Sequence, residues 1–156
     1  MSVYWSHPPG WTNPVNLRAS AALPAAGAWD ATPTESSAAL ASTVTLSFTY
    51  TRGAVGGAFD WQMEVSPYAV AANVAAGASE WVTEAIYAGG AVVAGADTTS
   101  LVQGELQSYT ATGAAAEDFV YGPIELNGVE RVRVRARESG VVGTPGTLQV
   151  EGTFAP

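Results

Sequence analysis

The chain has 156 residues, a formal net charge of −8 at pH 7, one histidine (His7), and neither cysteine nor lysine. The lack of cysteine excludes thiol catalysis, Cys-ligated zinc and disulfides, and one histidine is a poor supply for triads or metal sites, so we expect no cofactor. The acidic balance argues against a nucleic-acid partner, and the lack of a run of about 20 apolar residues argues against a membrane partner.

Residues 1–40 are predicted to form an extended arm that precedes a single domain at residues 41–156. Five prolines interrupt this segment and leave room for one short strand at residues 15–20. Disordered tails are poor in aromatic residues, so the aromatic residues of the arm predict that it docks, either on its own domain or on a neighbouring subunit. These anchors are Tyr4, Trp5, Trp11 and Trp29.

The period-two pattern begins at TVTLSFTYT (43–51), where apolar residues alternate with threonine and serine. FDWQMEVS (59–66) alternates in the same way after a glycine-rich connection. The two segments are therefore predicted to form a hairpin with one apolar face.

Weaker strands are predicted at residues 81–88, 100–110 and 118–126, with Gly104 and Pro123 indicating a bulge or an edge position. Asn127-Gly128 then predicts a hairpin turn before VERVRVRARE (129–138), and TLQVEGTF (147–154) is the last strand. Six or seven short strands without an amphipathic helix predict an all-β fold. We expect an antiparallel β-sandwich or a jelly-roll-like single domain.

Four of the six arginines stand at alternate positions of one predicted strand: Arg131, Arg133, Arg135 and Arg137. They would share one face about 6.6 Å apart, above a core face of Val132, Val134 and Ala136. Their repulsion requires acidic partners, for which the neighbouring strands offer Asp60, Glu64, Glu84, Glu125 and Glu151.

Three interpretations of this arginine row compete. The favoured interpretation is an ion-pair face within one sheet. A seam between subunits comes next, because arginine suits partly buried, bidentate pairs. Nucleic-acid binding is the least favoured, because the rest of the molecule is acidic.

The sequence offers residues for two further kinds of site. The pairs Glu117-Asp118 and Asp60/Glu64 resemble the two carboxylates of a glycosidase, but fourteen acids give such neighbours by chance, so we expect no catalytic residue and no enzyme. The five tryptophans would suit a sugar-binding platform, although Trp61 is in phase with the apolar face and is expected in the core.

The stretches GAWDATPTE (27–35), TLSFTYTRGAVGGAFDWQMEVSPY (45–68) and RVRVRARESGVVGTPGTLQV (131–150) follow a proline-rich arm. In these Gly-, Ala- and Thr-rich stretches the chain resembles the small, cysteine-free β-sandwich virion proteins of tailed bacteriophages, including capsid decoration proteins. The resemblance covers most of the chain and transfers no functional residue.

The resemblance implies a non-enzymatic structural protein that coats or cements a capsid or tail, commonly as a trimer with the arm around a neighbour. Its partners would be its own copies and a major capsid or other virion protein. It would act at the surface of the virion after assembly in the host cytoplasm. The alternatives are a carbohydrate-binding module and, least favoured, a hydrolase.

Overall fold

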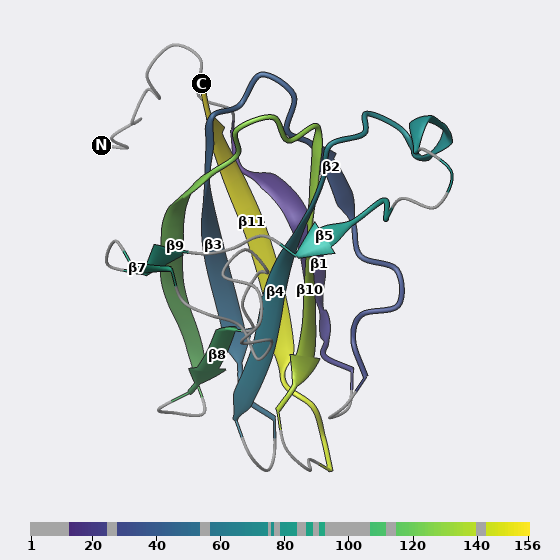
Figure 1. Ribbon diagram of the computed structural model, residues 1–156. Coiled ribbons are helices and arrows are strands. Elements are labelled where there is room, and N and C mark those ends of the chain that lie inside the picture. Colours follow the sequence, from purple (N-terminus) through teal and green to yellow (C-terminus); the bar gives the residue numbers. More distant parts are fainter. Residues whose placement is uncertain are drawn as a thin grey trace, which may run out of the picture.

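The computed structural model describes residues 13–24, 28–53, 57–74, 76, 79–83, 87–88, 91–92, 107–111, 115–139 and 143–156. Two antiparallel sheets pack face to face (Figure 1). The first sheet has the order β1 (Val15–Ala22), β11 (Thr147–Ala155), β3 (Thr43–Thr51) and β9 (Ala116–Glu125). The second has the order β2 (Glu35–Ser37), β10 (Arg131–Glu138), β4 (Ala58–Ser66) and β5 (Val82–Thr83), and β8 (Gln107–Thr110) also pairs with β4.

Three minor elements complete the described chain. The strands β6 (Tyr87–Ala88) and β7 (Ala91–Val92) pair with each other, and η1 (Ala71–Asn73) is a single 3₁₀ turn. The all-β class and the antiparallel sandwich are thus confirmed.

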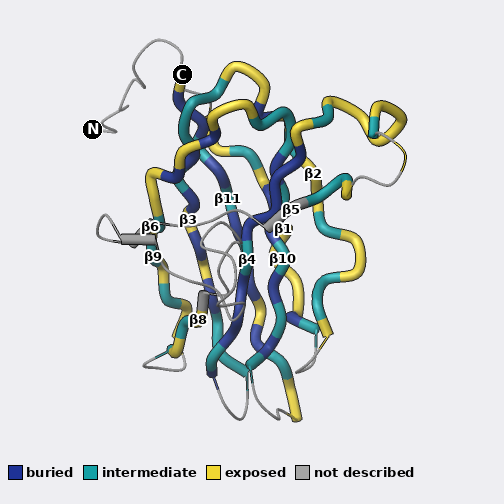
Figure 2. Tube along the Cα trace, viewed as in Figure 1, coloured by how far each residue is buried: buried dark blue, intermediate teal, exposed yellow. Residues whose placement is uncertain are grey.

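The core lies between the inner faces of β3 and β4 (Figure 2). On β3 buried side chains alternate with less buried ones, whereas most of β4 is buried on both faces. The Phe48 ring of β3 lies 4.7 Å from the Trp61 ring of β4, and the Tyr50 ring lies 4.7 Å from Phe59. Tilted aromatic pairs at this separation add to the free energy gained by burying their area. The expectation that Trp61 belongs to the core is confirmed.

The predicted hairpin between residues 43–51 and 59–66 is wrong. Strand β3 pairs with β11 and β9, whereas β4 pairs with β10, β5 and β8, so the glycine-rich connection crosses from one sheet to the other. Both strands still present apolar faces to the same core, because alternation determines which face is buried but does not choose the hydrogen-bonded neighbour.

The turn at Asn127-Gly128 exists but does not join paired strands. The Val129 N–H donates to the Leu126 carbonyl oxygen at 3.0 Å, and Gly128 has a φ of 76°. Strand β9 lies in the first sheet and β10 in the second, so the hairpin expected here is also wrong. The turn changes sheets instead of closing a ladder.

The expected bulge and edge position at Pro123 is confirmed. Strand β9 is the edge of the first sheet, and its register against β3 shifts between Val44 and Leu46. Gly122, with a φ of 127°, supplies the backbone conformation that the shift requires. Gly104 lies outside the described residues.

The segment before residue 41 contributes to both sheets. Strand β1 pairs with β11, and β2 pairs with β10. The expected division at residue 40 therefore does not mark a structural boundary, because strands that precede it complete the sandwich. The anchors Tyr4, Trp5 and Trp11 lie outside the described residues.

Glu138 is a fully buried acid at the end of β10, on the same face as Val134 and Ala136. Its Oε2 accepts a hydrogen bond from the Gly146 N–H at 3.0 Å, and its Oε1 accepts a long one from the Tyr50 hydroxyl at 3.4 Å. Burial raises the pKa of Tyr50 to about 12, and the Glu138 carboxylate acts in the same direction. The carboxylate thus holds the start of β11 against β3.

We expect Gly146→Ala to destabilise the protein. A Cβ at this position would meet the Tyr50 ring at 2.5 Å and the Thr51 carbonyl oxygen at 2.7 Å, so backbone or core must shift. Overpacking of this kind costs about 1–3 kcal/mol, measurable by urea unfolding. Gly143→Ala is the control, because nothing lies within 4 Å of its added Cβ. Equal stability of the two variants would contradict this packing.

Stability should fall at alkaline pH because of Tyr50. Its pKa is about 12 in the folded protein, against 10.0 for the unperturbed side chain, so the unfolded chain ionises first. The stabilisation is present below pH 10 and is lost as the pH rises toward 12. In Tyr50→Phe the free energy of unfolding should decline less over this range.

A control is needed because the Glu117 hydrogen bond also raises the pKa of Tyr109. Tyr109→Phe removes that contribution and should retain the decline caused by Tyr50. An alkaline decline in Tyr50→Phe as steep as in the unsubstituted chain would refute the assignment to Tyr50.

Candidate functional site on the outer face of β10

The four arginines of β10 project from the outer face of the second sheet. Val132, Val134 and Ala136 alternate with them and are fully buried. The arginine side chains themselves are only 11–27% exposed. Other parts of the same chain therefore cover most of each guanidinium.

Strand β4 supplies two of the carboxylates that offset these charges. Glu64 lies directly opposite Arg133 in the β10–β4 ladder, and its Oε2 accepts from the Arg133 Nε at 2.5 Å. Its Oε1 lies 3.4 Å from the Nη1 of Arg135. Asp60 lies opposite Arg137 and accepts from its Nε at 3.0 Å. The predicted partners Asp60 and Glu64 are confirmed.

Arg131 reaches carboxylates that do not belong to β4. Its Nη1 donates to Glu35 of β2 at 2.7 Å, and its Nη2 donates to Glu80 at 2.6 Å. The Nε donates to the Tyr68 carbonyl oxygen at 2.7 Å. The hydrogen bond to Glu80 raises the pKa of Arg131, which keeps the guanidinium charged. Four carboxylates thus offset four guanidiniums across this face.

Two tryptophans stack on the same guanidiniums. Arg133 lies 4.1 Å and Arg131 4.9 Å from the ring centroid of Trp81. Arg137 lies 4.5 Å from the ring centroid of Trp29. These distances suit cation–π attraction. Trp29, a predicted anchor of the arm, therefore contacts its own domain.

Asp30 links this face to the first sheet through Arg18. Its carboxylate accepts from the Arg18 Nε at 2.9 Å and from the Ala136 N–H at 3.0 Å, while its own N–H donates to the Ala136 carbonyl oxygen at 3.1 Å. Arg18 also donates to the carbonyl oxygens of Ala21, Ala22 and Leu148. Asp30 therefore pairs with Ala136 of β10, beyond the point where β2 ends.

Reasoning from the sequence missed Asp30, Glu35 and Glu80 as partners. All three lie in or beside connections whose path no periodic pattern reveals. The burial of Glu138 was predictable from the sequence, because Glu138 continues the alternate positions of Val132, Val134 and Ala136 that face the core. Of the other expected partners, Glu125 and Glu151 lie on the first sheet, and Glu84 lies outside the described residues.

The carboxylates considered for glycosidase chemistry are engaged elsewhere. Asp60 and Glu64 form the arginine pairs described above. Glu117 accepts from the Tyr109 hydroxyl, and Asp118 accepts from the Thr49 hydroxyl, both at 2.6 Å. Within the part of the chain that the structure describes, no group of three or more His, Cys, Asp or Glu side chains could hold a metal ion.

The described residues also include no helix that is long and apolar enough to cross a membrane. No family model, curated protein or solved structure matches the chain. The site must therefore be interpreted from its own geometry. That geometry favours the first of the three interpretations of the arginine row, an ion-pair face within one sheet.

We expect Glu64→Gln to destabilise the protein by about 1–3 kcal/mol, because it leaves two partly buried guanidiniums without their carboxylate. Glu35→Gln should cost far less, since Glu35 is 43% exposed against 8% for Glu64, and Arg131 retains Glu80. Urea unfolding of both variants is the measurement. A Glu64→Gln variant as stable as Glu35→Gln would mean that these pairs contribute little.

Proposed function

We propose that the chain is a non-enzymatic structural protein of a virion, of the tailed-bacteriophage capsid-decoration type, that self-associates and packs against other virion proteins. The resemblance noted above motivates the class. The trimer, the jelly-roll-like topology and the arm with Tyr4, Trp5 and Trp11 as anchors belong to this proposal. So does its place at the particle surface.

The contrast between the two outer faces is the observation that carries the proposal. On the second sheet the arginines are paired with carboxylates of the same chain. On the first sheet β3 presents a row of small hydroxyl side chains outward: Thr43, Thr45, Ser47, Thr49 and Thr51. Short, stiff side chains lose little conformational entropy on burial, so this face suits packing against another protein.

The charge on the first sheet indicates what could pack there. Its strands place three acids beside the hydroxyl row, Asp118, Glu125 and Glu151. The one arginine in these strands, Arg18, is buried against Asp30. A complementary partner surface would be neutral or basic.

The alternative of a carbohydrate-binding module gains no support from the described tryptophans. Trp61 is buried, and Trp29 and Trp81 lie against arginines. A sugar-stacking platform needs exposed aromatic faces, and none of these three residues is exposed. Trp5 and Trp11 lie outside the described residues.

Sedimentation velocity of the purified chain over a wide range of concentration tests the proposal. We expect oligomers, and we expect Ser47→Glu to weaken them, because it adds a further negative charge opposite Glu151 in the middle of the hydroxyl row. Asn73→Glu, a change at the exposed turn η1, is the control for added charge. A chain that remains monomeric at every concentration would contradict the proposed self-association.

A further inference from the structure

Leu40 occupies a backbone position that disfavours leucine. The Ala41 N–H donates to the Ala38 carbonyl oxygen at 2.9 Å, which closes a four-residue turn with Leu40 in its third position. Its φ is 73°, the left-handed conformation that glycine or asparagine adopts with least strain. Leu40 is the one non-glycine residue with positive φ among those described.

The adjoining turn at the same end of the sandwich has the expected residue. The Leu126 N–H donates to the Ser42 carbonyl oxygen at 2.8 Å, which ties the two turns together. In the second turn the third position is Gly128, with a φ of 76°. Leu40 therefore has strained backbone geometry at a place where a glycine would have none.

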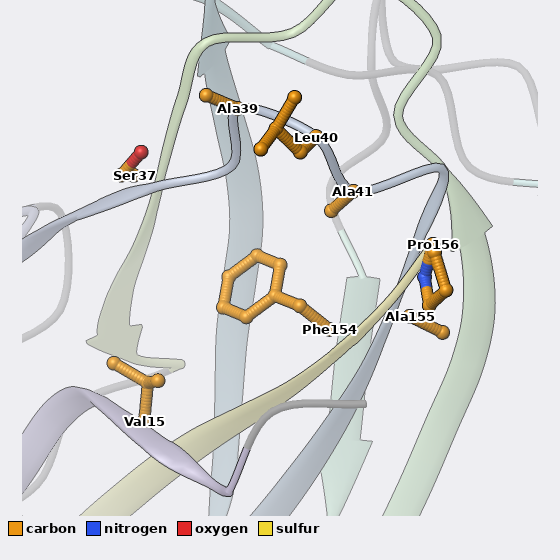
Figure 3. Close-up of a pocket in the computed structure, with 8 residues that line it drawn as sticks. All are labelled: Val15, Ser37, Ala39, Leu40, Ala41, Phe154, Ala155 and Pro156. Atoms are coloured by element: carbon orange, nitrogen blue, oxygen red, sulfur yellow. The ribbon is translucent and has the colours of Figure 1, made fainter. Parts of the chain in front are cut away.

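The Leu40 side chain is also 99% exposed, although it stands at the rim of an apolar pocket. Figure 3 shows it above the Phe154 ring, with Ala39 and Ala41 beside it. The pocket has a volume of about 270 Å³, and Val15 and Ala155 also line it. Leu40 therefore does not fill the pocket of its own molecule, and an exposed apolar side chain stands next to an open apolar pocket.

We propose that Leu40 of one copy inserts into this pocket of a second copy, and that the second copy does the same in return. Because the side chain and the pocket belong to the same patch, the contact is self-complementary and joins two copies about a two-fold axis. The inference rests on the proposed self-association and adds a contact distinct from any ring contact in a trimer. Burial of both leucines would offset the backbone strain.

The charge distribution favours a second copy as the occupant. None of the side chains that line the pocket is charged, whereas the whole chain carries a formal charge of −8. Pro156 also lines the pocket and carries the carboxylate at the end of this chain. Two copies still repel each other less through a patch without charged side chains than through the acidic outer face of the first sheet. Association through this end should therefore become stronger as added salt screens the remaining repulsion.

The absence of cysteine allows a direct test by disulfide formation. Under mild oxidation we expect Leu40→Cys to form a covalent dimer through the two Cys side chains that the two-fold contact brings together. Val70→Cys is the control, because Val70 is also an exposed apolar residue, 51% exposed, but it caps the turn η1 and neither lines the pocket nor belongs to the first sheet. Dimer yields that do not differ between the two variants would overturn the proposal.

A second variant measures the contact without a cross-link. Leu40→Asn keeps a residue that tolerates positive φ and removes the apolar side chain. We expect it to fold at least as stably as the unsubstituted chain and to associate at least about tenfold more weakly. Unchanged association would count against the inserted leucine. If Ser47→Glu still weakened the oligomer, the proposed function would stand without this contact.

The main competing occupant is the chain's own N-terminal segment, residues 1–12. In the double variant Ser6→Cys with Leu40→Cys, this occupant predicts an intramolecular disulfide at high dilution. That result, together with no dimer of Leu40→Cys, would overturn the two-fold contact. A dimer joined through residue 40 and no internal disulfide would support it.

Discussion

Neutralisation of charge across the β10–β4 ladder is the interaction on which the rest of the second sheet depends. Four guanidiniums at alternate positions of one strand would repel each other strongly in a partly buried, low-dielectric setting without acidic partners. Glu64 and Asp60 stand opposite Arg133 and Arg137 in the ladder, so the register that buries the β10 core face also brings the opposite charges together. A slip of one residue would remove both matches.

The same row explains how distant segments are held against this sheet. Glu35 and Glu80 approach Arg131 from β2 and from the segment before β5, and Trp81 lies over two of the guanidiniums. Asp30 continues the pairing of β10 where β2 has ended, and its contact with Arg18 connects the two sheets at their edge. Residues that precede β3, such as Asp30 and Glu35, thus form part of the folded domain.

The comparison of sequence with structure shows what a period of two can and cannot predict. The alternation in β3, β4, β10 and β11 correctly predicted which side chains enter the core, because a strand places alternate residues on opposite faces. It did not predict pairing, since a glycine-rich connection can close a hairpin or cross between sheets with the same pattern on either side. Asp60 and Glu64 were predictable because they lie at outward positions of a recognised strand. Asp30, Glu35 and Glu80 were not, because their positions depend on tertiary packing.

The central claim is that the arginine row is satisfied within the chain. A double-mutant cycle on Arg137→Gln and Asp60→Asn tests it most directly, with urea unfolding at the lowest protein concentration that gives a signal. A pair that interacts within one chain predicts a coupling free energy above the additivity error of about 0.3–0.5 kcal/mol, unchanged by dilution. Coupling that vanishes on dilution, or free-energy changes that are additive, would contradict the claim. Either result would favour an arginine row that pairs across an interface between subunits.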